Sequence, residues 1–157
     1  MSEGFYSTIA LSSEDETWRT PLKTWNELHN EFGFVLDACA LQSSTLVPDN
    51  WYGPDHPEVS RRDCLSSNWL EDSNGGPIFM NPPYGRTIGK FMAKALQEHH
   101  RGCTVVCLVP ARTDTGWWHD NVIAGKAEIR FIRGRLKFND GPNAAPFPSA
   151  VVIFNGN

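Results

Sequence analysis

Three short apolar runs, separated by helix-like patterns, constrain the fold of this chain more than any other feature of its sequence. The runs are FVLDACA at 34–40, PIFM at 77–80 and TVVCLVPA at 104–111. Over 20–32 and 87–102, apolar residues recur every three or four positions, which predicts amphipathic helices. Alternating strands and helices predict an α/β domain with a mostly parallel sheet and helices on both faces.

The first expected helix carries recognisable end signals. Thr20 is a good N-cap residue, and Pro21 suits the first helical position because its missing N–H is not needed there. Gly33 follows the last apolar residue of the pattern and is a stop signal. We therefore expect a helix that begins just after Thr20 and ends before Gly33.

The remaining segments are less regular. A short helix is expected at 116–124 and strands at 126–134 and 149–156. Because the last two strands lack a helix between them, we expect the final strand to be antiparallel. Residues 41–76 hold three prolines and a Gly-Gly pair, and 134–148 also lack a clear pattern, so both are expected to be mostly loop.

Length and charge limit the domain organisation. The 157 residues suffice for one domain, which we expect at 18–157 with no separate target-recognition domain. Residues 1–17 contain four acidic and no basic groups and are expected to form a flexible arm. The formal net charge is −4, but residues 84–138 carry ten basic groups against four acidic ones. That basic half permits binding to phosphate despite the acidic total.

Two further features of the sequence concern the cellular compartment of the protein and its capacity to bind metal. No apolar run approaches the roughly 20 residues of a membrane span, and the acidic N-terminus lacks the basic start of a signal peptide. These features predict a soluble, cytoplasmic protein that does not bind a membrane. The four cysteines are not spaced as a zinc site requires, so we expect reduced thiols and no metal.

The segment Asn81-Pro82-Pro83-Tyr84 is the most informative for function. It follows the expected strand at 77–80, and ligands of α/β sheets bind beyond the carboxyl ends of strands. The two prolines have no N–H, so the segment can present carbonyl oxygens to a ligand without competing donors. A planar amine could donate one hydrogen to the Asn81 side chain and one to the Pro82 carbonyl while its ring stacks on Tyr84.

Methylation of an amine requires this kind of site. The lone pair of a conjugated amine is delocalised into its ring, and two acceptors pull the nitrogen towards tetrahedral geometry and make the pair available for attack. No strong base is needed, because the proton leaves after methyl transfer. The competing interpretation is a rigid Pro-Pro turn with a surface tyrosine.

Beyond residue 17, nearly the whole chain resembles a known family. The matching segments, in order, are W-x-TP at 18–21, FGFVLDACA at 32–40, NPPYG at 81–85, LVPARTDTGWWH at 108–119, GRLKF at 134–138 and APFPSAVVIF at 145–154. This pattern is similar to the phage and prophage DNA adenine methyltransferases, often called phage Dam. The resemblance implies a Rossmann-like methyltransferase core, S-adenosylmethionine as cofactor, DNA as substrate and a bacterial host cell.

The resemblance also implies roles for individual residues. Thr20-Pro21 and Asp37 would meet the methionine end of the cofactor, with Asp37 at its amino group. Asp63 would accept a hydrogen bond from the amine of the cofactor's adenine, and a solvated loop aspartate is the competing interpretation. Asn81, Pro82 and Tyr84 would hold the target amine and base. Phe138 would lie on the far face of a base turned out of its stack, with a core phenylalanine as the alternative.

Basic residues near Phe138 suggest how DNA would be held. Arg130, Arg133, Arg135 and Lys137 are expected to neutralise backbone phosphates. Recognition of a particular DNA sequence would then come from the loops at 41–76 and 134–148 or from a second copy of the chain in a homodimer.

One departure from the family pattern keeps other functions open. No glycine lies between Gly33 and Gly53, where methyltransferases usually carry a glycine-rich cofactor loop. The alternatives are therefore a degenerate methyltransferase fold that binds DNA or a partner without catalysis, and an amino methyltransferase acting on cytosine, RNA or protein glutamine.

Overall fold

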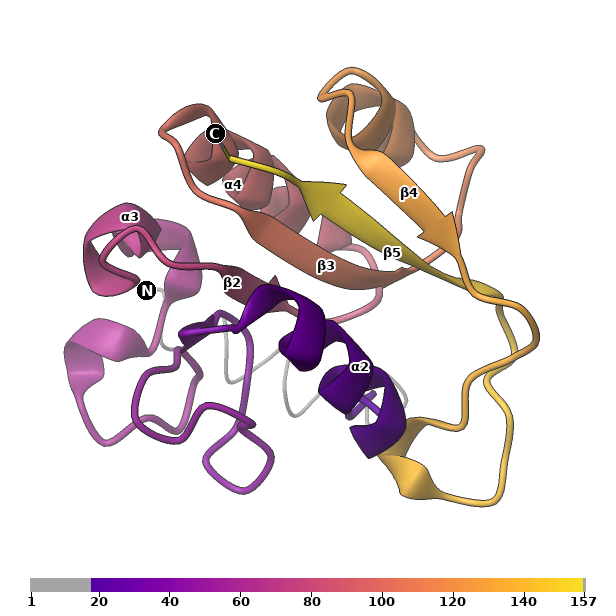
Figure 1. Ribbon diagram of the computed structural model, residues 1–157, viewed down its shortest axis with the longest axis horizontal. Helices are drawn as coiled ribbons and strands as arrows, with labels where there is room; N and C mark the ends of the chain where they lie inside the picture. Colours follow the sequence, from indigo (N-terminus) through magenta and orange to yellow (C-terminus); the bar gives the residue numbers. More distant parts are fainter. Residues whose placement is uncertain (1–17, 157) are drawn as a thin grey trace.

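A five-stranded sheet forms the centre of the protein, as the computed structural model shows for residues 18–156 (Figure 1). The expected arm at 1–17 lies outside the described residues. The order across the sheet is β1-β2-β3-β5-β4. The strands span Leu36–Asp37 (β1), Ile78–Met80 (β2), Val105–Pro110 (β3), Glu128–Phe131 (β4) and Ser149–Phe154 (β5).

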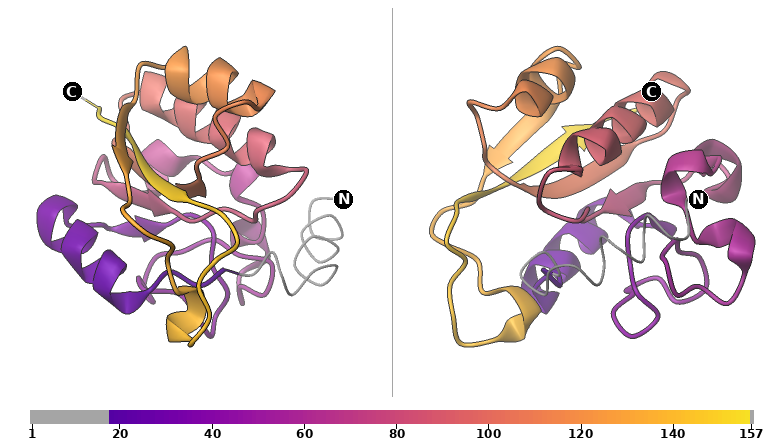
Figure 2. Two further views of the ribbon diagram at one scale, coloured as in Figure 1. Left: turned by 90° about the vertical axis from the view of Figure 1, so that its right-hand side faces the viewer. Right: turned by 180° about the vertical axis from the view of Figure 1, so that it is seen from behind.

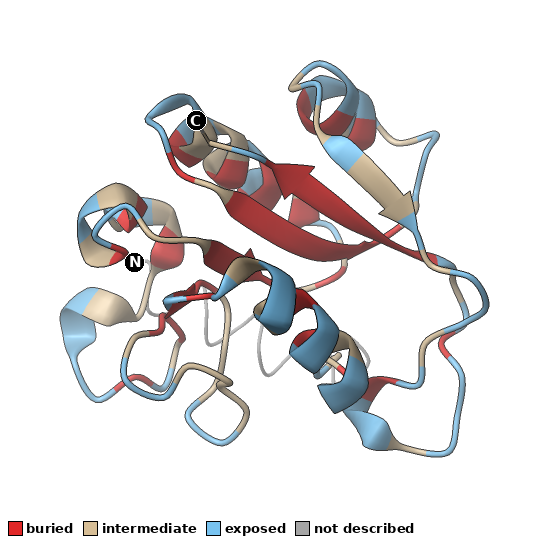
Figure 3. Ribbon diagram, in the orientation of Figure 1, coloured by how far each residue is buried: buried red, intermediate tan, exposed pale blue. Residues whose placement is uncertain are grey.

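The strand directions confirm a mostly parallel sheet with an antiparallel final strand. β1 pairs with β2 and β2 with β3 in parallel, whereas β5 is antiparallel to both β3 and β4. β5 therefore runs opposite to the other four strands. Every residue of β2, β3 and β5 is buried, as the continuous apolar character of their sequences requires (Figure 3).

Helices cover both faces of this sheet (Figure 2). On one face lies α2 (Leu22–Phe32), whose Trp25 meets Phe79 of β2 edge-to-face at 5.1 Å between ring centroids. On the other face lie α4 (Ile88–His100) and a π-helical turn at Trp118–Ile123. Within residues 18–156, no helix is both long and apolar enough to cross a membrane.

The start of α2 differs from the prediction. Pro21 is the N-cap residue and Leu22 the first helical residue, so Thr20 does not cap the helix. The backbone N–H of Leu22 donates instead to Oδ1 of Asp140, 118 residues away, at 3.2 Å. A distant carboxylate thus takes the role that the local sequence assigned to Thr20, and the Thr20 hydroxyl is available for another contact.

The first strand is shorter than the expected 34–40, because its outer neighbour is irregular. Residues 50–52 lie beside it, where Tyr52 N–H donates to the Asp37 carbonyl and Ala40 N–H to the Tyr52 carbonyl, but only an isolated bridge between Asp37 and Trp51 results. The rest of 41–76 is loop with short turns at Val59–Arg61 and Cys64–Ser66 and one turn of helix, α3 (Trp69–Asp72).

Candidate functional site

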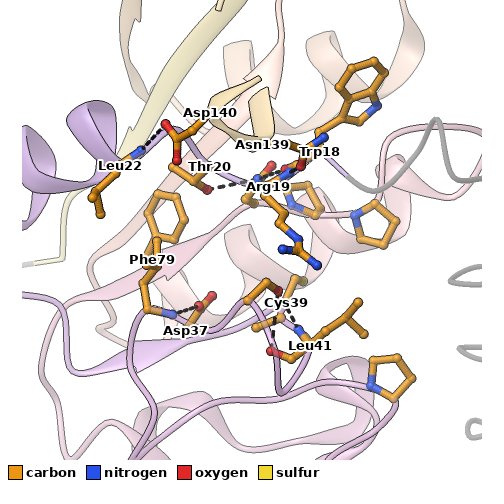
Figure 4. Close-up of a pocket in the computed structure, with 17 residues that line it drawn as sticks. Trp18, Arg19, Thr20, Leu22, Asp37, Cys39, Leu41, Phe79, Asn139 and Asp140 are labelled. Atoms are coloured by element: carbon orange, nitrogen blue, oxygen red, sulfur yellow. Dashed lines mark hydrogen bonds between the residues drawn. The ribbon is translucent and has the colours of Figure 1, made fainter. Parts of the chain in front are cut away.

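A cavity of about 300 Å³ opens at the carboxyl ends of β1 and β2 (Figure 4). Its walls come from the segment before α2, the chain that follows β1, the Asn-Pro-Pro segment after β2 and the turn before β5. The lining residues are Trp18, Arg19, Thr20, Leu22, Asp37, Cys39, Ala40, Leu41, Ser44, Leu46, Pro54, Phe79, Asn81, Pro82, Pro83, Asn139 and Asp140.

Asp37 is a buried carboxylate in this cavity. It is 4% exposed and accepts hydrogen bonds from Leu46 N–H at 3.2 Å and from the Thr45 hydroxyl at 3.4 Å. Burial raises the pKa of Asp37 to about 7, and the hydrogen bonds from Leu46, Thr45 and Cys39 offset only part of this effect. Among the ion pairs of residues 18–156, none includes Asp37. The carboxylate therefore favours a cationic ligand.

Asn81 presents an amide oxygen that lacks a hydrogen-bond donor. Its Nδ2 donates to the carbonyl of Trp18 at 2.5 Å and to the hydroxyl of Thr20 at 3.0 Å. Because the Trp18 carbonyl can only accept, these contacts determine which end of the amide carries the nitrogen. Oδ1 of Asn81 is buried and has no partner within residues 18–156. Such an atom is costly to leave unpaired and is suited to a ligand N–H.

The turn at Phe138–Asp140 holds the segment before α2 over the cavity. Arg19 N–H donates to Oδ1 of Asn139 at 2.8 Å, and Asn139 N–H donates to the Arg19 carbonyl at 2.9 Å. Asn139 and Asp140 have φ values of 62° and 51°, a left-handed conformation that Asn and Asp tolerate better than most residues. The turn therefore determines where Trp18 and Thr20 lie relative to Asn81.

An aromatic cluster adjoins the cavity at Trp18. The indole lies 5.5 Å from the ring of Phe138, 5.3 Å from that of Phe147 and 6.5 Å from that of Tyr84, to which it is stacked at 23°. Tyr84 is only 2% exposed, and its hydroxyl donates to the Leu108 carbonyl at 3.0 Å. The ring of Tyr84 is therefore covered in this structure.

A comparison with known protein families adds to this geometry. The family model of the DNA N-6-adenine-methyltransferases (Dam) matches residues 7–151. The chain belongs to this family. No curated protein matches the chain.

The structure of this Dam family member brings most of the predicted site together. Thr20, Asp37, Asn81, Pro82 and Pro83 line one cavity, and Pro21 is buried at the start of α2. Tyr84 and Phe138 belong to the adjoining aromatic cluster, with Phe138 4% exposed. The basic residues Arg133, Arg135 and Lys137 are exposed on the segment that leads to Phe138.

Two predicted residues lie elsewhere. Asp63 does not line the cavity. Its carboxylate caps the turn at Cys64–Ser66, where it accepts from Leu65 N–H at 3.0 Å and from the Ser66 hydroxyl at 3.1 Å. Arg130 makes two 2.7 Å hydrogen bonds to the carboxylate of Glu31 and a third to Glu128, so its charge is balanced within the protein.

The chain directly after β1 contains no glycine and packs closely against the segment at Gly53. Cys39 and Ala40 follow β1 and line the cavity with small side chains. Gly53 lies on the neighbouring segment, so close to Ala40 that a Cβ at position 53 would stand 1.8 Å from the Ala40 carbonyl oxygen. Only glycine fits there. Close packing of these two segments of the chain therefore depends on Gly53.

Sequence reasoning did not assign roles to Arg19, Asn139 or Asp140. The Asn-Asp-Gly run at 139–141 is a turn signal, but such a signal does not reveal which distant segment the turn contacts. Within residues 18–156, no group of three or more His, Cys, Asp or Glu side chains is arranged to hold a metal ion.

Proposed function

We propose that this protein transfers a methyl group from S-adenosylmethionine to the exocyclic N6 amine of adenine in DNA, on a Rossmann-like methyltransferase core. Membership of the Dam family supports the reaction class. The observation that carries the proposal is the buried, unpartnered Oδ1 of Asn81 beside the cavity. A protein that only binds DNA has no need to keep an acceptor desolvated and free at this position.

The cavity suits the cofactor. Its volume lies at the lower end of the range for small-molecule sites, roughly 300–1,000 Å³. Asp37 offers a buried anionic partner to the amino group, and apolar walls from Leu41, Leu46 and Pro54 suit a flat aromatic ring. When bound, S-adenosylmethionine supplies a methyl group on a sulfonium centre, which is released as a thioether when the methyl group leaves.

The residues of the chain prepare the amine. Asn81 Oδ1 and the Pro82 carbonyl each accept one N–H of the target amine, and this localises its lone pair on nitrogen. The contacts of Asn81 with Trp18 and Thr20 hold the amide in the required orientation before the substrate arrives, so little reorganisation is needed during the reaction. After transfer, the extra proton on nitrogen passes to water.

Entry of a base requires Trp18 to move. The indole is stacked against Tyr84, and Phe138 and Phe147 close the other sides. A base that stacks on Tyr84 therefore displaces the indole and replaces its aromatic contacts with its own, which offsets part of the cost of leaving the DNA stack.

The test is methyl transfer from labelled S-adenosylmethionine to unmodified duplex and single-stranded DNA, followed by mass analysis of the nucleosides. The expected product is N6-methyladenine. Label in N4-methylcytosine, or cofactor binding without label in DNA, would contradict adenine as the acceptor. Failure to bind the cofactor would favour a non-catalytic DNA- or partner-binding module.

A further inference from the structure

The side chain of Arg19 extends from the segment before α2 into the cavity, towards Cys39 and Leu41 (Figure 4). It is the one cationic residue among the described residues that line the cavity. Its backbone is held on both sides by Asn139, so the side chain starts from a defined position. No hydrogen bond or ion pair of its guanidinium is found within residues 18–156.

The charges of the cavity are thus separated. Asp37 is buried at one wall, whereas Arg19 is exposed and reaches in from the opposite side. The carboxylate of Asp140, the other acidic group in the lining, accepts from Leu22 N–H at the start of α2. The cavity therefore presents a buried carboxylate, Asp37, that lacks a cation and one guanidinium that lacks an anion, while the Asp140 carboxylate is already engaged by a backbone N–H.

We propose that Arg19 binds the carboxylate of an α-amino acid group whose ammonium is held by Asp37. An α-amino acid carries both charges on one carbon, so it can satisfy both side chains at once. A guanidinium suits this role because its N–H groups match the two oxygens of a carboxylate. The inference rests on the proposed function, in which this group is the methionine end of S-adenosylmethionine. It identifies a specificity residue at the position that the W-x-TP motif leaves unspecified.

The experiment compares ligands that differ by the carboxylate alone. Titration calorimetry in the absence of DNA would measure the affinity of the full chain and of its Arg19→Gln variant for two ligands. The ligands are S-adenosylmethionine and its decarboxylated analogue, which retains the ammonium and the sulfonium. The substitution leaves the backbone contacts with Asn139 available. We expect Arg19→Gln to weaken S-adenosylmethionine about tenfold and to leave the affinity of the decarboxylated analogue unchanged.

Two control variants separate the possible outcomes. Lys23→Gln removes a nearby exposed charge that does not line the cavity and should change neither affinity. Arg19→Lys should recover part of the lost affinity. An equal loss of affinity for both ligands would overturn the role of Arg19, and so would unchanged affinities for both. Unchanged affinities together with a flatter salt dependence of DNA binding would assign Arg19 to a DNA phosphate. If the unmodified protein bound neither ligand, the proposed function itself would fail.

Discussion

The side-chain nitrogen of Asn81 donates to the main-chain carbonyl of Trp18 at 2.5 Å, across 63 positions of sequence. This hydrogen bond joins the Asn-Pro-Pro segment to the chain that precedes α2. It also aims the amide oxygen of Asn81 away from the protein's own donors, which explains why that oxygen is buried without a partner. The same contact thus builds one wall of the cavity and leaves the amide oxygen free to accept from a ligand.

Replacement of Asn81 by alanine should abolish most turnover. The substitution removes one of the two acceptors for the target amine, and loss of a single preorganised hydrogen-bonding group of this kind costs about 100-fold to 1,000-fold in kcat. Cofactor binding, measured by calorimetry, should be largely retained. Thr20→Val is the matched variant, because it removes one contact that orients the amide but keeps the acceptor, and it should cost less. Normal turnover by Asn81→Ala would exclude the amide from the chemistry.

Cofactor affinity should rise with pH through neutrality. The pKa of Asp37 is raised to about 7, so the carboxylate is mostly protonated at pH 6 and mostly ionised at pH 8. A cationic amino group binds the ionised form, so affinity should be about tenfold higher at pH 8 than at pH 6. Asp37→Asn should bind weakly with little pH dependence over this range. A pH-independent affinity in the unmodified protein would argue against Asp37 as the partner of the ammonium.

The turn at Phe138–Asp140 can be tested through its backbone conformation. Asn139→Gly keeps the left-handed φ accessible but removes the side-chain acceptor for Arg19 N–H. We expect a loss of about 1 kcal/mol in the free energy of unfolding and weaker cofactor binding, because Trp18 and Thr20 lose part of their support. Asn139→Ala adds the strain of a left-handed alanine, about 1–2 kcal/mol more. Thermal unfolding and calorimetry measure both effects, and equal stabilities of the two variants would contradict the conformational argument.

The salt dependence of DNA binding tests the exposed basic segment. Replacing Arg133, Arg135 and Lys137 together by glutamine should reduce the slope of log affinity against log salt by about 2 to 3, if each contacts one duplex phosphate. Lys126→Asn is the control, since it removes an exposed charge before β4 at a position whose φ of 55° asparagine tolerates. An unchanged slope in the triple variant would place the DNA surface elsewhere on the protein.

Local patterns were sufficient to predict the fold class and the order of elements along the chain. The buried strands, the amphipathic helices and the antiparallel last strand follow from runs of apolar residues and from the missing helix between 134 and 149. The position of Asp37 and Asn81 at one edge of the sheet follows from strand direction, because parallel strands bring their carboxyl ends together. The Asn-Pro-Pro-Tyr motif also indicated the reaction class that the family comparison supports.

What the sequence by itself determined, therefore, was the order of elements and the acceptor and aromatic groups that the central motif offers, both of which depend on neighbours in the chain. Tertiary structure decided the contacts made across long stretches of sequence. The Thr20 hydroxyl accepts from Asn81, and the backbone N–H of Leu22 at the start of α2 donates to Asp140. Asp63 caps a local turn, and the Arg19 side chain extends into the cavity. Single polar residues can satisfy their hydrogen bonds with many partners, and only the packed chain determines which partner lies within reach.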